Sequence, residues 1–151
     1  MYLKKLALIC VAFWLICLSG CCGIVEEESP YEGREVKEGI VLSMDQTVYS
    51  KDVEQMTFYL KNTTQEEFHF GYHWKLEIFY KEKWYSVPLV KSCVINDIAV
   101  ISRPGTVTEV SVNSLGCYAH PLKKGSYRLV HDNYDKRDKD NTIIFIEFEV
   151  K

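Results

Sequence analysis

The sequence lacks the short motifs that mark the common enzyme classes. It contains no Ser-centred nucleophile elbow, no paired-glycine phosphate loop and no His-Glu-x-x-His pair of zinc ligands. Each of these motifs places reactive or ligating groups at a fixed spacing, and nothing else in the chain offers an equivalent arrangement. We therefore expect a protein that is not an enzyme and that needs no cofactor.

An excess of positive charge is also missing. The chain carries 18 basic and 21 acidic side chains, which gives a formal net charge of −3. The first twenty residues contain Lys4, Lys5 and no acid, so the remainder has two fewer basic groups and a net charge of −5. Binding to nucleic acid needs clustered Lys and Arg, and we therefore expect no nucleic-acid partner.

Helical periodicity is absent too, and a period of two takes its place. The stretch 72–88 reads YHWKLEIFYKEKWYSVP, and its apolar side chains alternate on both sides of a polar break at 81–83. This pattern predicts a β-hairpin, and its two tryptophans indicate that the hairpin is central to the domain. Four residues are expected in the core: Trp74, Trp84, Phe58 and Leu76.

Further short alternating segments, separated by turn residues, continue along the chain. Seven or eight strands of this kind predict an all-β, two-sheet antiparallel sandwich over 36–151. The apolar segment 93–101 has no clear form in the pattern. The expected strands are 39–44, 53–60, 68–72, the two arms of the hairpin, 106–112, 126–130 and 143–150.

The N-terminus has the order of an export signal, with Lys4 and Lys5 ahead of an apolar run that ends in small residues. The tetrapeptide Leu18-Ser19-Gly20-Cys21 resembles the bacterial lipobox, which implies a signal peptide over 1–20 and a lipid on Cys21. The alternative is an uncleaved anchor helix, because twenty residues from Leu6 are nearly all apolar. Both alternatives attach the chain to the cell membrane, facing the outside of the cytoplasm.

The residues after the lipobox are acidic and are broken by Pro30 and Gly33. This composition predicts that 21–35 is a lipidated N-terminus followed by a flexible tether. Fourteen tether residues would reach about 50 Å when fully extended, which keeps the domain near the membrane surface.

Six cysteines fall into two groups. Cys10 and Cys17 lie in the expected signal peptide, while Cys21 is the lipid site and Cys22 beside it is expected to stay a free thiol. Outside the cytoplasm the remaining pair, Cys93 and Cys117, is a candidate disulfide; two buried thiols are the alternative.

The histidines and aspartates do not form a convincing metal site. His69 and His73 are four residues apart, which in a strand separates them by about 13 Å. Cys117 and His120 form at most half of a tetrahedral set. Four aspartates lie close together in one loop, but their spacing does not match the EF-hand pattern, and neighbouring basic residues nearly neutralise their charge. They are Asp132, Asp135, Asp138 and Asp140.

Three segments are similar to a family of bacterial immunoglobulin-like domains found in exported proteins, mostly of Gram-positive bacteria. They are 53–62, the hairpin 72–88 with its Lys-Trp-Tyr-Ser-Val-Pro end, and 122–130, which resembles the family's L-K-x-G-x-Y-R strand entry. Arg103-Pro104-Gly105 stands where such domains have a Pro-Gly turn. The resemblance implies an immunoglobulin-like β-sandwich with no known catalytic residues, although the cysteine pair of antibody domains is missing from its usual strands.

Two functions fit this sequence. The first is a non-catalytic envelope lipoprotein whose domain binds a protein or a cell-wall partner near the membrane. The second is a lipoprotein that binds a small ligand or a metal and serves an envelope enzyme or transporter. For the first, the outward positions of the strands would carry Tyr59, Phe79 and Tyr85, unless the register is shifted by one residue.

Overall fold

The computed structural model describes residues 27–90, 93, 98–118, 121–132 and 142–151. The expected signal peptide, the alternative anchor helix and Cys21 lie outside these residues. Within the described part of the chain, no helix is long and apolar enough to span a membrane.

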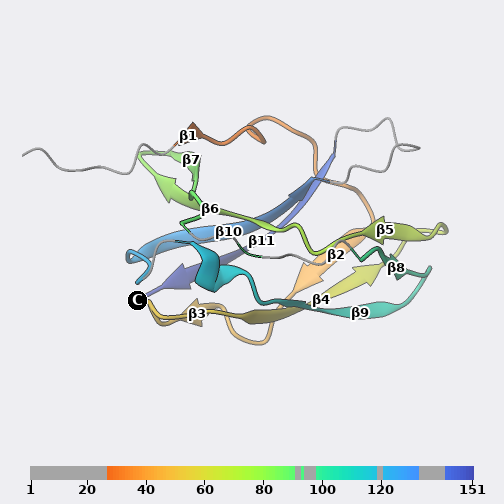
Figure 1. Cartoon of the computed structure of the whole chain (residues 1–151). Helices are drawn as coiled ribbons and strands as arrows, with labels where there is room; N and C mark the ends of the chain where they lie inside the picture. The colour runs from red at the N-terminus through yellow and green to blue at the C-terminus, as the bar shows by residue number, and fades with distance from the viewer. Residues whose placement is uncertain (1–26, 91–92, 94–97, 119–120, 133–141) are drawn as a thin grey trace, which may run out of the picture.

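The regular structure of the described chain consists of strands, apart from one 3-10 turn (Figure 1). The six-stranded sheet has the order β1-β7-β6-β10-β11-β3, the three-stranded sheet β2-β4-β9, and the small sheet β5-β8. All neighbours pair antiparallel except β3, which pairs parallel with β11. The bounds are β1 Glu27–Glu28, β2 Ile40–Ser43, β3 Val48–Tyr49, β4 Met56–Asn62, β5 Phe68–Phe70, β6 Lys75–Tyr80, β7 Lys83–Ser86, β8 Val100–Ser102, β9 Val107–Val112, β10 Gly125–Asp132 and β11 Ile143–Val150, with a 3-10 turn at Leu115–Cys117.

The two larger sheets face each other, with β4 and β9 of the three-stranded sheet below β7, β6 and β10 of the six-stranded sheet in Figure 1. Alternate side chains of β4 and β11 are buried between them, as a period of two requires. Trp74 lies just before β6 and packs edge-on against Phe58 of β4, with ring centroids 4.8 Å apart. Leu76 lies in the same buried cluster. The predicted immunoglobulin-like β-sandwich is confirmed; the strands outnumber the expected seven or eight because four of them have only two or three residues.

The turn of the β6–β7 hairpin differs from the expected one. It has two residues, Lys81 and Glu82, because Lys83 already pairs with Tyr80. The pairing therefore brings Trp84 opposite Phe79 on the outer face of the sheet. The expectation that Trp84 packs into the core is thus corrected: one residue fewer in the turn moves each side chain of the second strand to the other face.

The segment expected to be a tether is part of the fold from Glu27 onward. β1 pairs with β7, and the Ser29 N–H donates a hydrogen bond to the Trp84 carbonyl at 2.9 Å. Tyr31 is only 2% exposed, and the Ile143 N–H donates to the Glu35 carbonyl at 2.9 Å. Residues 27–37, called the covering segment below, thus lie across the outer face of the six-stranded sheet. The expectation of a flexible tether is therefore corrected for residues 27–35, which belong to the fold.

Two of the segments that resemble immunoglobulin-like domains organise turns. Asn62 is fully buried at the end of β4, and its side-chain amide donates to the carbonyls of Glu66 and Ser102, each at 2.8 Å. Tyr127, near the start of β10, donates from its hydroxyl to the Lys123 carbonyl at 2.9 Å. A buried tyrosine that bonds back to the backbone just upstream of its strand is a known device of β-sandwiches for fixing a corner.

Candidate interaction surfaces

The outer face of the six-stranded sheet contains a buried ion pair. Glu77 of β6 and Arg128 of β10 are cross-strand neighbours and are 1% and 6% exposed. The Arg128 Nε and Nη2 both lie 2.7 Å from Oε2 of Glu77, and Nη2 also donates to the Ser29 hydroxyl at 3.3 Å. The guanidinium lies 4.4 Å from the ring centre of Trp84 and 5.3 Å from that of Phe145. These charges are held by the fold and are not presented to solvent.

Tyr31 of the covering segment completes this face. Its hydroxyl hydrogen-bonds to the Lys75 ammonium and lies 3.4 Å from an Asp132 carboxylate oxygen. Burial raises the pKa of Tyr31 above its usual value, although the hydrogen bond from Lys75 opposes this change. Burial alone would lower the pKa of Lys75, but the hydrogen bond with Tyr31 and the charge of Asp132 outweigh it and raise that pKa. The covering segment is therefore bonded to the sheet by both polar and apolar contacts.

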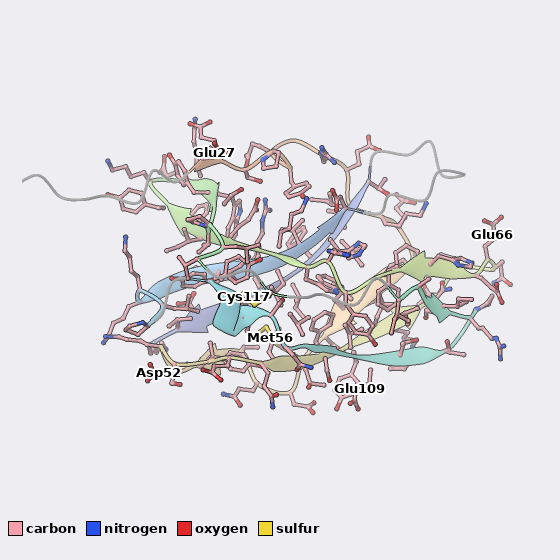
Figure 2. All side chains as sticks on the ribbon, in the orientation of Figure 1. Glu27, Asp52, Met56, Glu66, Glu109 and Cys117 are labelled. Atoms are coloured by element: carbon pink, nitrogen blue, oxygen red, sulfur yellow. A yellow bond between two sulfur atoms is a disulfide. The ribbon has the colours of Figure 1, made fainter. Side chains whose placement is uncertain are left out.

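The outer face of the three-stranded sheet is different, because no described segment lies across it. Three cross-strand rows define it: Val41, Lys61 and Val107 form one, Ser43, Tyr59 and Glu109 form the next, and Thr57 pairs with Ser111 in the third. Val41 is 52% exposed and Val107 is 60% exposed. In Figure 2 the Glu109 side chain points away from the body of the domain, on the side opposite to Glu27. We call this surface the open face; it comprises Val41, Ser43, Thr57, Tyr59, Lys61, Val107, Glu109 and Ser111.

The structure does not bring the three predicted surface aromatics together. Tyr59 lies half-buried on the open face, where its hydroxyl donates to Asp45 at 3.4 Å. The charge of Asp45 raises the pKa of Tyr59. Phe79 is exposed on the outer face of the other sheet, and Tyr85 pairs with Ile78 and packs partly against the core. Tyr59 and Phe79 thus lie at outward positions of opposite sheets, as the alternation predicts. Only the position of Tyr85 is corrected, because the shorter turn moves it to the inner face.

Four aromatic side chains, Phe79, Tyr80, Trp84 and Tyr85, lie at the end of the β6–β7 hairpin. We call them, together with the turn residues Lys81 and Glu82, the aromatic tip. Phe79 and Trp84 have ring centroids 5.0 Å apart on one face, and Tyr80 and Tyr85 have centroids 6.4 Å apart on the other. Phe79 is 44% exposed and Tyr80 is 52% exposed. The position of this turn in the alternation could be read from the sequence, but its length could not.

A buried histidine lies on the inner face of β10. His131 is packed between Trp74 and Phe70, and its Nε2 accepts a hydrogen bond from the Gly71 N–H at 3.2 Å. Burial lowers its pKa to about 4, and the positive groups of His73 and Lys75 add to this effect, while Asp132 opposes it. The imidazole is therefore neutral near pH 7 and serves as an acceptor in the core.

Among the candidate metal ligands, His69, His73, Cys117 and Asp132 lie in the described part of the chain. Among the residues that the structure describes, no group of three His, Cys, Asp or Glu side chains could hold a metal ion. His69 on β5 faces Glu67 at 3.7 Å, and His73 is exposed. Asp132 contacts Lys75 at 3.4 Å. His120 and three of the loop aspartates, Asp135, Asp138 and Asp140, lie outside the described residues, as does Cys22, the expected free thiol.

Cys93 and Cys117 are joined in a disulfide, with Cα atoms 6.0 Å apart. Cys117 is buried in the 3-10 turn, whereas Cys93 is exposed. The next residue, Tyr118, accepts a hydrogen bond at its hydroxyl from the Leu76 N–H at 3.1 Å. The disulfide thus joins Cys93 to a turn that is itself held against β6 by the hydrogen bond to Tyr118.

Comparison with known families agrees with this architecture. Residues 36–143 match the model of a family described as a bacterial Ig-like domain. The chain belongs to this family. Domains of the family are generally non-catalytic modules. No curated protein is significantly similar to the chain. The match begins at Val36, so nearly all of the covering segment precedes the bacterial Ig-like domain as the family defines it.

The sequence reasoning missed the residues that distinguish the two outer faces. Glu77 and Arg128 occupy outward positions of their strands, where a charged side chain is normally solvated. The available signal was their place on the outward face together with Tyr31, an aromatic residue inside an otherwise acidic stretch. An aromatic residue in a presumed tether is a sign that the segment packs against something.

Proposed function

We propose that this protein is a membrane-anchored envelope lipoprotein whose bacterial Ig-like domain binds a protein or cell-wall partner through the open face. The lipobox Leu18-Ser19-Gly20-Cys21 supports the anchor, and the family supports a non-catalytic binding module. A lipid on Cys21 would attach the chain to the cell membrane, with the domain outside the cytoplasm.

The observation that carries this proposal is a difference between the two outer faces. The covering segment lies across the six-stranded sheet, whereas no described segment lies across the three-stranded sheet. A sheet with one solvated face normally carries polar side chains there, and large apolar ones are buried. On the open face, Val41 and Val107 flank Lys61 in one row while both remain more than half exposed. Tyr59 lies in the next row. Apolar and aromatic side chains interleaved with a few charges are the composition of protein-binding surfaces.

The folded covering segment also changes how far the domain can lie from the membrane. Cys21 stands six residues before Glu27, where β1 begins. Six residues reach about 20 Å when fully extended, compared with about 50 Å for the tether expected from sequence. The partner should therefore be membrane-bound or should lie in the part of the envelope directly next to the membrane.

The binding surface is tested by replacing Val41, Tyr59 and Val107 together with Ser and isolating the protein with its partners after cross-linking in intact cells. The expected result is a domain that stays folded, with a melting temperature lowered by no more than a few degrees, and the loss of the cross-linked partner. Val36→Ser with Val48→Ser is the matched control, because these valines are also exposed but lie outside the open face. Retention of the partner by the triple variant and its loss from the control would contradict the proposal.

The anchor is tested separately with Cys21→Ala. This variant should carry no label after growth with a fatty-acid analogue, and its precursor should remain uncleaved because the modified cysteine is the recognition feature. Label that persists on the variant would exclude Cys21 as the lipid site.

A further inference from the structure

The aromatic tip has a composition that differs from every other exposed turn in the described part of the chain. Phe79 and Tyr80 remain about half exposed although each packs on a second ring. The Lys81 ammonium lies 5.1 Å from the ring centre of Tyr80, and the neighbouring Lys83 pairs with Glu28 at 2.8 Å. Rings and lysines in this arrangement occur where proteins meet the headgroup region of a membrane, because each has an apolar body and a polar end.

The backbone of the turn is a second, independent observation. Lys81 and Glu82 both adopt positive φ, at 48° and 64°, which non-glycine residues do at some cost in free energy. A two-residue hairpin turn of this shape favours Asn-Gly, which would relieve the strain. The chain instead keeps two long charged side chains at the point of the hairpin. Strain of this kind persists where the side chains have a use.

The position of the tip relative to the lipid anchor is the third observation. β1 lies beside β7 (Figure 1). Glu27 pairs with Ser86. Four strand positions separate Ser86 from the turn, a distance of about 13 Å. The six-residue link from Cys21 to Glu27 spans about 20 Å at most, so the tip can reach the surface in which the lipid is inserted. The open face lies on the other sheet and is not hidden by this contact.

We propose that the aromatic tip contacts the headgroup interface of the membrane that anchors the chain, and so fixes the orientation of the domain on that membrane. The inference rests on the proposed lipid anchor at Cys21. Glu27, Glu28 and Glu82 offset the local lysines, so the contact depends on the rings and is not an attraction between a basic patch and anionic lipid. The lipid surface is held at one end of the domain, which leaves the open face directed away from β1 and available to a partner.

Trp84 provides a direct probe, because the processed chain retains Trp74 and Trp84 and only Trp84 lies at the tip. The processed, lipidated protein is reconstituted into vesicles of phosphatidylcholine and phosphatidylglycerol, with and without brominated phosphatidylcholine. Bromine quenches tryptophan fluorescence only at short range. We expect quenching in the wild type, its loss in Trp84→Phe, and its decrease in Phe79→Ser with Tyr80→Ser, where Trp84 is retained.

Three controls separate the possible outcomes. Vesicle flotation reports the anchor: wild-type protein that does not float would overturn the lipid anchor, and the tip contact with it. Protein that floats but shows the same fluorescence on brominated and ordinary vesicles would overturn the tip contact alone, as when the tip meets a second copy or another protein. Val41→Ser with Val107→Ser should leave quenching unchanged. Quenching that disappears in high salt or without phosphatidylglycerol would contradict the dependence on aromatic rings.

Discussion

The two outer faces of this sandwich begin from the same sequence pattern and end in opposite environments. On both sheets, outward positions alternate with core residues and include acids, bases and a few apolar side chains. On the six-stranded sheet, the covering segment buries Glu77 and Arg128 and brings Tyr31 over β10 and β11. On the three-stranded sheet, no described segment performs this role, and Val41 and Val107 stay in solvent.

This difference shows that an outward strand position is not by itself a surface position. What decides the environment is whether another segment has apolar groups and hydrogen-bond donors to place there. The covering segment offers the ring of Tyr31, the hydroxyl of Ser29 and the backbone groups of residues 35–37. The open face receives none of these from the described chain, and a partner molecule would supply the equivalent contacts.

Breaking the buried pair should have the largest effect. Glu77→Leu leaves the Arg128 guanidinium without its carboxylate in a site closed to water, and should lower the free energy of unfolding by about 3–5 kcal/mol. Glu109→Leu is the matched control on the open face and should change it by less than about 0.5 kcal/mol. Urea unfolding monitored by fluorescence measures both. Equal losses of unfolding free energy in the two variants would mean that Glu77 is no more buried than Glu109.

Two tyrosines give a second matched comparison. Tyr31→Ala removes a buried ring from the covered face and should cost about 3 kcal/mol. Tyr59→Ala removes a partly exposed ring from the open face and should cost about 1 kcal/mol or less. Thermal unfolding of the two variants at one pH measures the difference. If Tyr59→Ala is the more damaging, the ring of Tyr59 is part of the fold and the open face loses its main aromatic contact.

The titration of His131 tests whether water is excluded from the inner face of the six-stranded sheet. The pKa of His131 is about 4 in the folded state and about 6.5 in the unfolded chain. As the pH falls from 6.5 to 4, only the unfolded state takes up the proton, so this group should remove about 3 kcal/mol of stability in that window. His131→Gln should lose that part of the pH dependence. An unaltered pH profile in the variant would show that His131 titrates normally.

The smallest predicted effect is a gain. Lys81→Asn with Glu82→Gly places the residues that a two-residue hairpin turn favours at the two positions of positive φ, and should stabilise the domain by about 1 kcal/mol. The same change removes the charged side chains of the aromatic tip. A loss of stability would mean that Lys81 and Glu82 contribute contacts beyond their backbone geometry.

Sequence reasoning recovered the parts of the fold that depend on local alternation. β4 keeps a period of two over its seven residues, and β11 does so from Ile146 to Val150, which leaves a single choice for the buried face. It failed at the hairpin turn, because Lys83 has the polarity of a turn residue although it pairs with Tyr80. No Asn-Gly pair marks the turn, so its length, and with it the face of Trp84, could not be fixed from local signals.

The candidate surfaces could be predicted only in part, because whether a sheet face is buried depends on a segment that is distant from it in sequence. β1 has two acidic residues and no alternation, so nothing local indicates that it joins a sheet. The pairing of Glu77 with Arg128 requires the register between β6 and β10, which are separated in sequence by the 44 residues from 81 to 124. Alternation alone predicts that Tyr59 lies on an outer face, whereas the complete fold is needed to show that no described segment covers that face.

Site-specific photo-cross-linking in intact cells tests the central claim most directly. A photoreactive benzoylphenylalanine is placed at Val107 on the open face or at Glu147, an exposed outward position of β11 on the six-stranded sheet. The account predicts a discrete adduct from Val107 that disappears when Val41 and Tyr59 are also replaced by Ser, and no adduct from Glu147. A discrete adduct from Glu147 with none from Val107 would contradict it, because the covered sheet would then be the side that binds.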